Sequence, residues 1–291
     1  MPDKDMKIGF IGTGVMGASM AMNVMRGGYP LAVYNRTKER ALPLTHQGAV
    51  WMDTVAELSA WADAVITIVG YPKDVEQVYF GKDGILENAR AGSFTIDMTT
   101  SKPKLAKKIY KAAKEKGISA LDAPVSGGDI GAKNATLTIM AGGDQEAFEA
   151  LTPVFQRMGS NITLLGGAGF GQHTKLCNQI AIAGAIMGVC ESLAYAKKAG
   201  LDPESVLKCI SSGAASSWQL SGNAPRMLKD DYAPGFYIKH FVKDMGIAIE
   251  EAEELGLAAP ALKLAKSLYD MLVEEGKENL GTQALYLLYN R

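Results

Sequence analysis

A lysine and an asparagine, Lys175 and Asn178, follow the glycine-rich turn Gly169-Phe-Gly171 and begin a long apolar segment. In a helix, positions three and four apart are neighbours, so this spacing places Lys175, Asn178 and Gln179 on one face. The helix dipole disfavours a cation near a helix start, which favours a functional role for Lys175 over that of a surface lysine. An ammonium can stabilise the negative oxygen of a reacting carbonyl and protonate it. We therefore predict that Lys175 is a general acid/base.

The helix that must hold these side chains is strongly apolar. Residues 180–190 include no charged or strongly polar side chain, which predicts a core helix, about 173–199, that is buried nearly all round. The apolar run is far shorter than the roughly 20 residues that cross a bilayer, so we expect no membrane span. A helix that is apolar on more faces than one domain can cover also predicts a homodimer or homotetramer.

A second candidate site lies near the N-terminus, where the β-rich run Lys7 to Ile11 enters a glycine-rich turn and then a helical stretch. Three glycines in this turn suit a dinucleotide: the first for a tight turn, the second for approach to a pyrophosphate, the third for close helix packing. Such turns also occur as plain helix caps, but the second strand at 31–34 favours the dinucleotide. The predicted cofactor-binding residues are Gly12, Thr13, Gly14, Val15, Met16 and Gly17.

The end of that second strand indicates which dinucleotide is bound. An NAD site usually has an acidic residue there, whereas this chain has Asn35, Arg36 and Thr37. A guanidinium flanked by amide and hydroxyl donors suits a 2′-phosphate, so we predict NADP(H), with NAD(H) still possible. In the alternative, Arg36 is a solvated surface residue and Thr37 caps the next helix.

Alternating strand and helix patterns continue to about residue 165 and predict a parallel sheet with helices on both faces. In such sheets, ligands bind beyond the carboxyl ends of the strands. This rule places two more segments along the cofactor, Val69-Gly-Tyr71-Pro72 and Thr99-Thr100-Ser101.

The segment Asp122-Ala-Pro124-Val-Ser126-Gly127-Gly128 could bind a small carboxylate. In that interpretation Pro124 fixes the chain, while Ser126 and the two glycines turn backbone donors towards the anion. An ordinary β-turn fits the same residues equally well, so both alternatives stay open.

Beyond Gly171 the pattern becomes helical, without a clear strand. We predict an α/β Rossmann-type N-terminal domain with a parallel sheet over residues 1–167. A long helix joins it to an all-α C-terminal domain over 168–291, which serves substrate binding and dimerisation. Helices are expected from Asp202-Pro203, over 217–229 and over 241–255.

Composition narrows the function classes. The chain has 291 residues, with 30 basic and 31 acidic side chains and a formal net charge of −1, so we expect no nucleic-acid partner. Three cysteines without a Cys-x-x-Cys pair, and three histidines, predict neither a disulfide framework nor a metal site. The first residues contain no apolar targeting region, so a cytoplasmic location is expected.

Four motifs occur in order along the chain. They are Gly12-x-Gly14-x-x-Gly17, Asp122-Ala-Pro-Val-Ser126-Gly-Gly128, Gly169-x-Gly171-x-x-x-Lys175-x-x-Asn178 and Lys243-Asp244. With them the chain resembles the β-hydroxyacid dehydrogenase family over nearly all of its length. This family includes 3-hydroxyisobutyrate dehydrogenase, tartronate semialdehyde reductase and the glyoxylate/succinic semialdehyde reductases.

The resemblance implies that Lys175 is the catalytic acid/base and that Asn178 holds the substrate or the lysine. It further implies that the substrate contacts Ser126, Gly127, Gly128 and Asp244, and that the cofactor contacts Thr100 and Lys243. Trp218, Phe236 and Tyr237 could wall the substrate pocket or belong to the core, and Phe236 is our candidate for substrate contact. The chain departs from many members at Gln179, where they have a second asparagine.

The expected activity is NADPH-dependent reduction of a small aldehyde or keto acid, of the glyoxylate, succinic semialdehyde or tartronate semialdehyde type. In reverse this is a 3-hydroxyacid dehydrogenase. One alternative is an NAD-dependent 3-hydroxyisobutyrate dehydrogenase, and a second is a non-catalytic dinucleotide-binding module. A decarboxylating sugar-phosphate dehydrogenase shares the lysine–asparagine arrangement, but enzymes of that kind have a much longer chain than this one.

Overall fold

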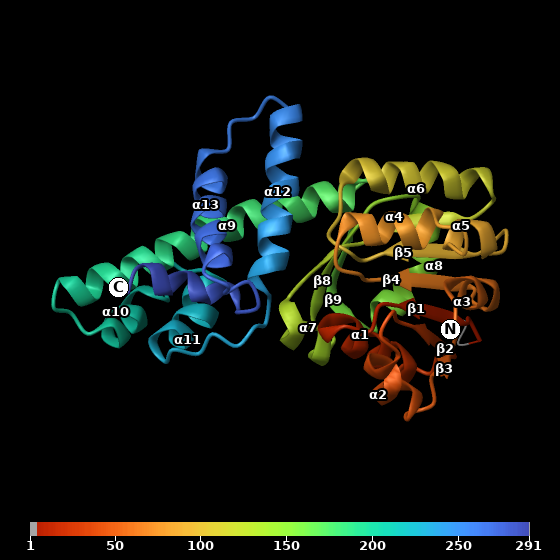
Figure 1. The fold of residues 1–291 in the computed structure, drawn as a ribbon, viewed down its shortest axis with the longest axis horizontal. Coiled ribbons are helices and arrows are strands. Elements are labelled where there is room, and N and C mark those ends of the chain that lie inside the picture. Colours follow the sequence, from red (N-terminus) through yellow and green to blue (C-terminus); the bar gives the residue numbers. More distant parts are fainter. Residues whose placement is uncertain (1–4, 291) are drawn as a thin grey trace. The chain divides into compact units, whose positions relative to one another are not determined.

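A computed structural model describes residues 5–290 of the chain. Contacts divide the chain into two compact units, which meet in the sequence between Lys175 and Leu176, inside one long helix. Figure 1 shows an N-terminal unit of strands and helices and a C-terminal unit of helices. The predicted domain boundary at 167 stays a prediction.

The first unit is built on a six-stranded parallel sheet with the order β3-β2-β1-β4-β5-β6. In this order the first strand lies at the centre, β2 and β3 extend the sheet on one side, and β4, β5 and β6 extend it on the other. This arrangement is expected for dinucleotide-binding sheets. It confirms the predicted Rossmann-type fold. The strands are β1 Ile8–Ile11, β2 Leu31–Tyr34, β3 Val50–Trp51, β4 Ala64–Thr67, β5 Phe94–Asp97 and β6 Ser119–Asp122.

Helices cover both faces of this sheet because successive strand side chains point to opposite faces. Ile66 of β4 packs in one hydrophobic cluster with Met20 of α1, whereas its neighbour Val65 packs in another with Leu58 of α3 and Ile109 of α6. The helices of this part are α1 Val15–Arg26, α2 Leu42–Thr45, α3 Val55–Trp61, α4 Pro72–Phe80, α5 Ile85–Asn88 and α6 Pro103–Glu115, with a short 3₁₀ helix, η1, at Lys38–Ala41.

A second, three-stranded sheet completes the first unit, and the sequence patterns did not indicate it as a separate sheet. β7 (Val125–Ser126) pairs antiparallel with β8 (Leu137–Ala141), which pairs parallel with β9 (Gly159–Leu164). Helices α7 (Gly128–Asn134) and α8 (Gln145–Phe155) connect these strands. With only two residues after a proline, β7 offers no alternating pattern, so the sequence could not reveal the antiparallel pair.

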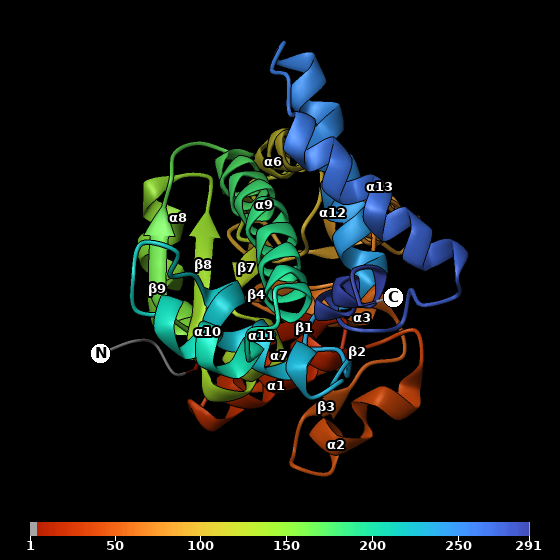
Figure 2. The same ribbon diagram turned by 90° about the vertical axis from the view of Figure 1, so that its left-hand side faces the viewer.

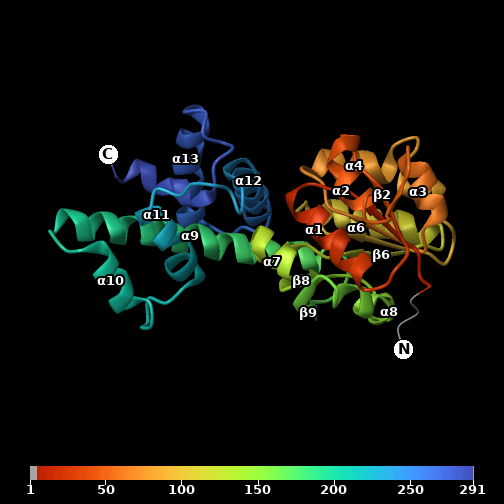
Figure 3. The ribbon, with the colours of Figure 1, turned by 90° about the horizontal axis from the view of Figure 1, so that it is seen from below.

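The long helix α9 covers Phe170–Lys198 (Figure 3). Ala183, Ile186 and Cys190 are buried, but Gly184 and Gly188 are exposed, so the prediction of burial nearly all round was wrong for the single chain. Small apolar residues occupy the exposed side of α9, so the sequence pattern does not distinguish the exposed side from the buried one. By length and composition α9 could also cross a membrane, a test that core helices of soluble proteins pass as well.

The second unit is helical. Among its described residues, β-structure is limited to one isolated β-bridge between Tyr237 and Gly281. The predicted helix over 217–229 is divided into a π-helical turn and a short α-helix. Helices α12 and α13 pack side by side (Figure 2). The elements are α10 Pro203–Ile210, η2 Gln219–Asn223, α11 Ala224–Leu228, α12 Ile238–Glu254, α13 Pro260–Glu274 and the 3₁₀ helix η3 Thr282–Leu288.

Candidate active site

The three glycines of the N-terminal turn have the three different surroundings that a dinucleotide turn requires. Gly12 has φ +97°, and a Cβ atom there would lie 2.1 Å from the carbonyl oxygen of Ile68. A Cβ atom at Gly17 would lie 1.9 Å from the carbonyl oxygen of Gly12, whereas one at Gly14 would have no protein atom within 4 Å. The turn is therefore closed at both ends and open at Gly14, where a pyrophosphate would approach.

Thr13 and Asn35 connect this turn to the end of β2. The backbone N–H of Thr13 donates to Oδ1 of Asn35 at 3.0 Å, and Nδ2 of Asn35 donates to the carbonyl oxygen of Thr37 at 2.8 Å. The Thr13 hydroxyl is buried and has no hydrogen-bond partner among the described residues. A buried orphan donor beside the open Gly14 fits a phosphate ligand, so the residues present suit a dinucleotide.

Arg36 lies at the carboxyl end of β2 and is largely exposed, with 74% of its side chain in solvent. Its Nη1 is 3.0 Å from Oδ1 of Asp74 in α4, while Oδ2 of Asp74 accepts the N–H of Tyr71 at 3.1 Å. Asp74 thus orients the guanidinium and leaves most of its donors facing solvent. Thr37 occupies the N-cap position of η1, as the alternative predicted, but its side chain makes no capping hydrogen bond.

A polar network beneath the predicted cofactor segments was not foreseen. Oδ1 of the buried Asp97 accepts hydrogen bonds from Thr67 Oγ1 and from the N–H of Thr99, both at 3.0 Å. The Thr99 hydroxyl accepts the N–H of Val69 at 2.9 Å. Burial raises the pKa of Asp97 to about 6, although these hydrogen bonds act in the opposite direction. The network fixes the segments 69–72 and 99–101 at adjoining strand ends.

The candidate anion site begins in β7 and continues into α7. Ser126 is the last residue of β7, and the next two residues have positive φ angles, +132° at Gly127 and +64° at Gly128. Residues with a side chain rarely adopt such angles, which explains both glycines. The segment therefore starts a helix, and its successive N–H groups have the irregular backbone from which anion nests are made.

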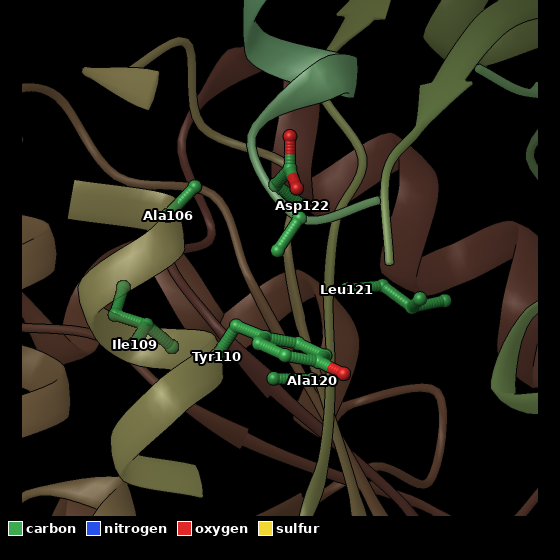
Figure 4. Close-up of a pocket in the computed structure, with 7 residues that line it drawn as sticks. Ala106, Ile109, Tyr110, Ala120, Leu121 and Asp122 are labelled. Atoms are coloured by element: carbon green, nitrogen blue, oxygen red, sulfur yellow. The ribbon is translucent and has the colours of Figure 1, made fainter. Parts of the chain in front are cut away.

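The start of α9 is held by Asp122, the last residue of β6. Its two carboxylate oxygens accept the N–H groups of Gly169 at 2.7 Å and Gln172 at 2.8 Å, which caps the helix that carries Lys175. In Figure 4 the carboxylate points towards this turn of α9. Burial raises the pKa of Asp122 to about 6, against the lowering effect of the two N–H donors. Lys175 itself is buried, with 6% exposed.

A cavity of about 10 Å³ lies next to Asp122, between α6 and β6 (Figure 4). This space is about the smallest that can hold one water molecule. The substrate is therefore not expected in this cavity. Its lining residues are Ala106, Ile109, Tyr110, Ala120, Leu121, Asp122 and Ala168.

In the second unit, a chain of polar side chains joins Asn178 to Lys243. Asn178 Nδ2 donates to Gln179 Oε1 at 2.7 Å, and Gln179 Nε2 donates to Asp244 Oδ2 at 2.6 Å. The Lys243 ammonium is 3.0 Å from Asp244 Oδ1. Gln179 is fully buried, and its side chain links two polar groups. It donates to the buried Asp244 carboxylate and accepts a hydrogen bond from Asn178, its neighbour on α9, so its polar atoms are satisfied inside the protein.

The aromatic candidates of the second unit differ in how far they are buried. Phe236 packs edge-on against Phe241 with ring centres 5.7 Å apart, and it is partly buried against the helical core. Trp218 is 65% exposed and Tyr237 is half-buried. Core packing therefore accounts for Phe236, and its contact with substrate stays a prediction.

Family models cover both units. Residues 7–167 match the NAD-binding domain of 6-phosphogluconate dehydrogenase, and residues 169–289 match the model described as NAD-binding of NADP-dependent 3-hydroxyisobutyrate dehydrogenase. The chain belongs to the 3-hydroxyisobutyrate dehydrogenase family. This confirms the resemblance found in the sequence and makes the protein an NAD(P)-dependent oxidoreductase of the β-hydroxyacid dehydrogenase type.

Individual relatives are similar to this chain over nearly their full length. An uncharacterized oxidoreductase of Bacillus subtilis, YkwC, is 63% identical over 97% of this chain and 98% of its own. The 2-hydroxy-3-oxopropionate reductase of Escherichia coli is 39% identical over 96% of each chain. A solved structure of Mycobacterium tuberculosis 3-hydroxyisobutyrate dehydrogenase with L-serine has a TM-score of 0.91 at 29% identity, covering 99% of this chain and 100% of that one.

Proposed function

We propose that the protein is an NADPH-dependent reductase of small aldehyde or keto acids, of the glyoxylate, succinic semialdehyde or tartronate semialdehyde type. The reverse reaction oxidises the corresponding hydroxyacid, which for tartronate semialdehyde carries the reacting hydroxyl on carbon 3. The observation that carries this proposal is the burial of Lys175, which is only 6% exposed, near the start of a helix that Asp122 caps. Lysine is almost never fully buried, and proton transfer to a carbonyl oxygen would give a buried lysine at this position a function.

The proposed preference for NADP(H) rests on Arg36. β2 ends without a carboxylate, Asn35 is engaged with the glycine turn, and Arg36 presents its guanidinium to solvent at the strand end. A 2′-phosphate would accept charge-assisted hydrogen bonds from it. The family model over 169–289, named for an NADP-dependent enzyme, supports the same preference.

The chemistry assigned to the chain is proton transfer and positioning. NADPH, when bound, supplies a hydride to the carbonyl carbon of the substrate. Lys175 donates a proton to the carbonyl oxygen as negative charge develops there, and in the reverse reaction it takes the hydroxyl proton. Asn178 holds the substrate or the lysine. The proton goes to the carbonyl oxygen and the hydride to the carbonyl carbon. Both donors must therefore be oriented on the same carbonyl group at once, which requires the lysine to be held in place beforehand.

Backbone donors are proposed to recognise the substrate carboxylate. Ser126 and the N–H groups at Gly127 and Gly128 form the anion site, supported by the positive φ angles of both glycines. Phe236 and Asp244 are proposed as further substrate contacts. Thr100 and Lys243 are proposed to contact the cofactor, together with Val69, Tyr71 and Pro72 at the end of β4.

A second candidate function is NAD-dependent 3-hydroxyisobutyrate dehydrogenase. It is supported by the similarity to the M. tuberculosis enzyme, whose structure holds L-serine, a small acid with a hydroxyl on the β-carbon. The similarity to the E. coli 2-hydroxy-3-oxopropionate reductase supports the first candidate instead. Both candidates share the lysine and differ in cofactor and substrate.

One experiment separates these functions. The purified protein is assayed with glyoxylate, succinic semialdehyde and tartronate semialdehyde for reduction, and with 3-hydroxyisobutyrate and serine for oxidation, each with both cofactors. The proposal expects the highest kcat/KM for one of the aldehyde acids with NADPH. A highest kcat/KM for 3-hydroxyisobutyrate with NAD would select the second candidate. Cofactor binding without turnover of any acid would support a non-catalytic module and contradict both.

We also propose that the protein forms a homodimer or homotetramer. Gly184 and Gly188 lie one helical turn apart on the exposed side of α9, and a Cβ atom at either would have no protein atom within 4 Å. Another backbone could approach closely there. Light scattering at micromolar concentration tests this, and a monomeric mass would contradict it.

A further inference from the structure

Gln172, in the first turn of α9, connects that helix to a distant loop. Its Nε2 donates to the carbonyl oxygen of Thr99 at 2.8 Å, and its Oε1 accepts the N–H of Ser101 at 2.8 Å. The side chain is fully buried, so both ends of the amide are used on backbone groups that have no access to water. Gln172 thus holds the residues before and after Thr100, which is proposed to contact the cofactor.

Gln172 is itself held by Asp122, which accepts its backbone N–H at 2.8 Å. The backbone closes tightly around this carboxylate. A Cβ atom at Gly142 would lie 2.8 Å from Asp122 Oδ1, and one at Gly171 would lie 2.8 Å from Oδ2. Because the carboxylate has little freedom to move, the first turn of α9 is fixed to the end of β6.

Lys175 is three positions beyond Gln172, so the two side chains lie on neighbouring positions of one helical face. Gln172 therefore restrains the same face of α9 that carries the lysine, and it does so through the loop that carries Thr100. Asp122, Gln172 and Lys175 all belong to the first unit.

We propose that Gln172, held by Asp122, is a positioning residue that fixes Lys175 relative to the Thr99–Ser101 loop. This inference rests on the proposed function, in which Lys175 is the proton donor and Thr100 contacts the cofactor. Loss of the two amide hydrogen bonds lets the loop and the helix start shift independently. A misplacement of about 1 Å between reacting groups can lower a rate about 100-fold, so kcat is the sensitive quantity.

The test replaces Gln172 by Met, which keeps the length of the side chain and removes both hydrogen bonds. The matched control is Gln283→Met in the second unit. Gln283 is also buried, and its Nε2 donates to two backbone carbonyl oxygens, of Asp231 at 3.0 Å and Ala233 at 2.9 Å. For both variants we measure kcat at saturating substrate and NADPH, the Kd of NADPH by fluorescence titration, and Tm.

The proposal expects kcat of Gln172→Met to fall about 10- to 100-fold, with the Kd of NADPH changed less than about threefold. Gln283→Met should lose a similar amount of Tm and keep its kcat. A kcat of Gln172→Met within twofold of the parent overturns the inference, as does an equal loss of kcat in the control. If Gln172→Met does not fold, Gln172→Glu, which keeps the acceptor for Ser101 and loses the donor to Thr99, must show the same selective loss.

Failure of the inference can be distinguished from failure of the proposed function. A Lys175→Ala variant is measured in parallel. If it loses turnover while Gln172→Met keeps it, the proton donor stands and the positioning role is wrong. If Lys175→Ala keeps its turnover, the proposed function fails first, and any loss of kcat in Gln172→Met then has another cause.

Discussion

The guanidinium of Arg36 lies 3.0 Å from the carboxylate of Asp74, which itself accepts the N–H of Tyr71. This contact holds the arginine at the end of β2 without burying it. We predict that Arg36→Ala lowers kcat/KM with NADPH about 10- to 100-fold, because one or two charge-assisted hydrogen bonds to the 2′-phosphate are lost. The value with NADH should change little, and both are measured by steady-state kinetics.

The chain offers a matched control for this prediction. Arg90 also forms an exposed arginine–aspartate pair, with Asp63 at 2.6 Å, but at the amino ends of the strands. Arg90→Ala should leave the ratio of the two kcat/KM values unchanged. If Arg36→Ala leaves it unchanged as well, the proposed preference for NADP(H) is wrong.

Lys175 gives a second prediction. Lys175→Ala should lower kcat by about 10²- to 10⁴-fold, the range typical of losing a general acid. NADPH should still bind, because the glycine turn and Arg36 are unchanged, and a fluorescence titration measures this. Lys198→Ala, which removes an exposed lysine at the other end of the same helix, should keep full activity. Normal turnover in Lys175→Ala would exclude the lysine as the proton donor.

The glycine turn gives a third prediction, which compares two glycine-to-alanine substitutions that each add one methyl group. Gly17→Ala places a Cβ atom 1.9 Å from a carbonyl oxygen, so the backbone must shift, and both Tm and NADPH affinity should fall. Gly14→Ala meets no protein atom within 4 Å, so Tm should stay the same. Its NADPH affinity should fall about tenfold or more, because the methyl group occupies the approach of the pyrophosphate. Normal NADPH binding by Gly14→Ala would contradict this mode of binding.

Asp97 gives a prediction about pH. Its pKa is raised by burial to about 6, from an ordinary value of 3.8, so between these pH values the folded chain binds more protons than the unfolded chain. The contribution of Asp97 to the free energy of unfolding is therefore largest below pH 3.8 and is lost as pH rises through 6. Asp97→Asn should remove this dependence, so wild type loses stability relative to the variant between pH 4 and 7.

Urea unfolding at several pH values measures that difference. Trp51 and Trp61 belong to the first unit and Trp218 to the second, so Trp218→Phe as the parent limits the fluorescence signal to the unit that contains Asp97. Asp122, whose pKa is also raised to about 6, is present in both proteins and contributes to both curves. Parallel curves for parent and variant would show that Asp97 is not held at a raised pKa.

Elements with a local sequence pattern could be predicted. β1, the glycine turn and α1 follow from about twenty consecutive residues, and Asp202 caps α10 through the N–H groups of Glu204 and Ser205, as the Asp-Pro pair indicates. The two-residue strand β7 could not be predicted, because its position depends on pairing with β8 rather than on its own sequence. The exposed side of α9 was missed because its glycine and alanine residues are of types that are most often buried.

Contacts between distant segments account for the rest. The motif around Asp122 drew attention to Ser126 and its glycines, yet the carboxylate acts on residues 47 and 50 positions later. The signal for it was an acidic residue at the end of a buried strand, where an unpaired carboxylate would be costly. Gln172 offered a similar signal, a long amide between the glycines and Lys175, but its partners in the 99–101 loop appear only in the fold.

The fit of Gly142 and Gly171 around Asp122 also bears on how such a chain can diverge. A larger acid at position 122, or any side chain at 142 or 171, meets occupied space, so these positions can be exchanged only in combination. Arg36 stands mostly in solvent and can be exchanged alone. Under the role proposed for Arg36, evolution can reach a new cofactor preference through a single substitution, whereas the attachment of α9 to β6 would have to be inherited as one block.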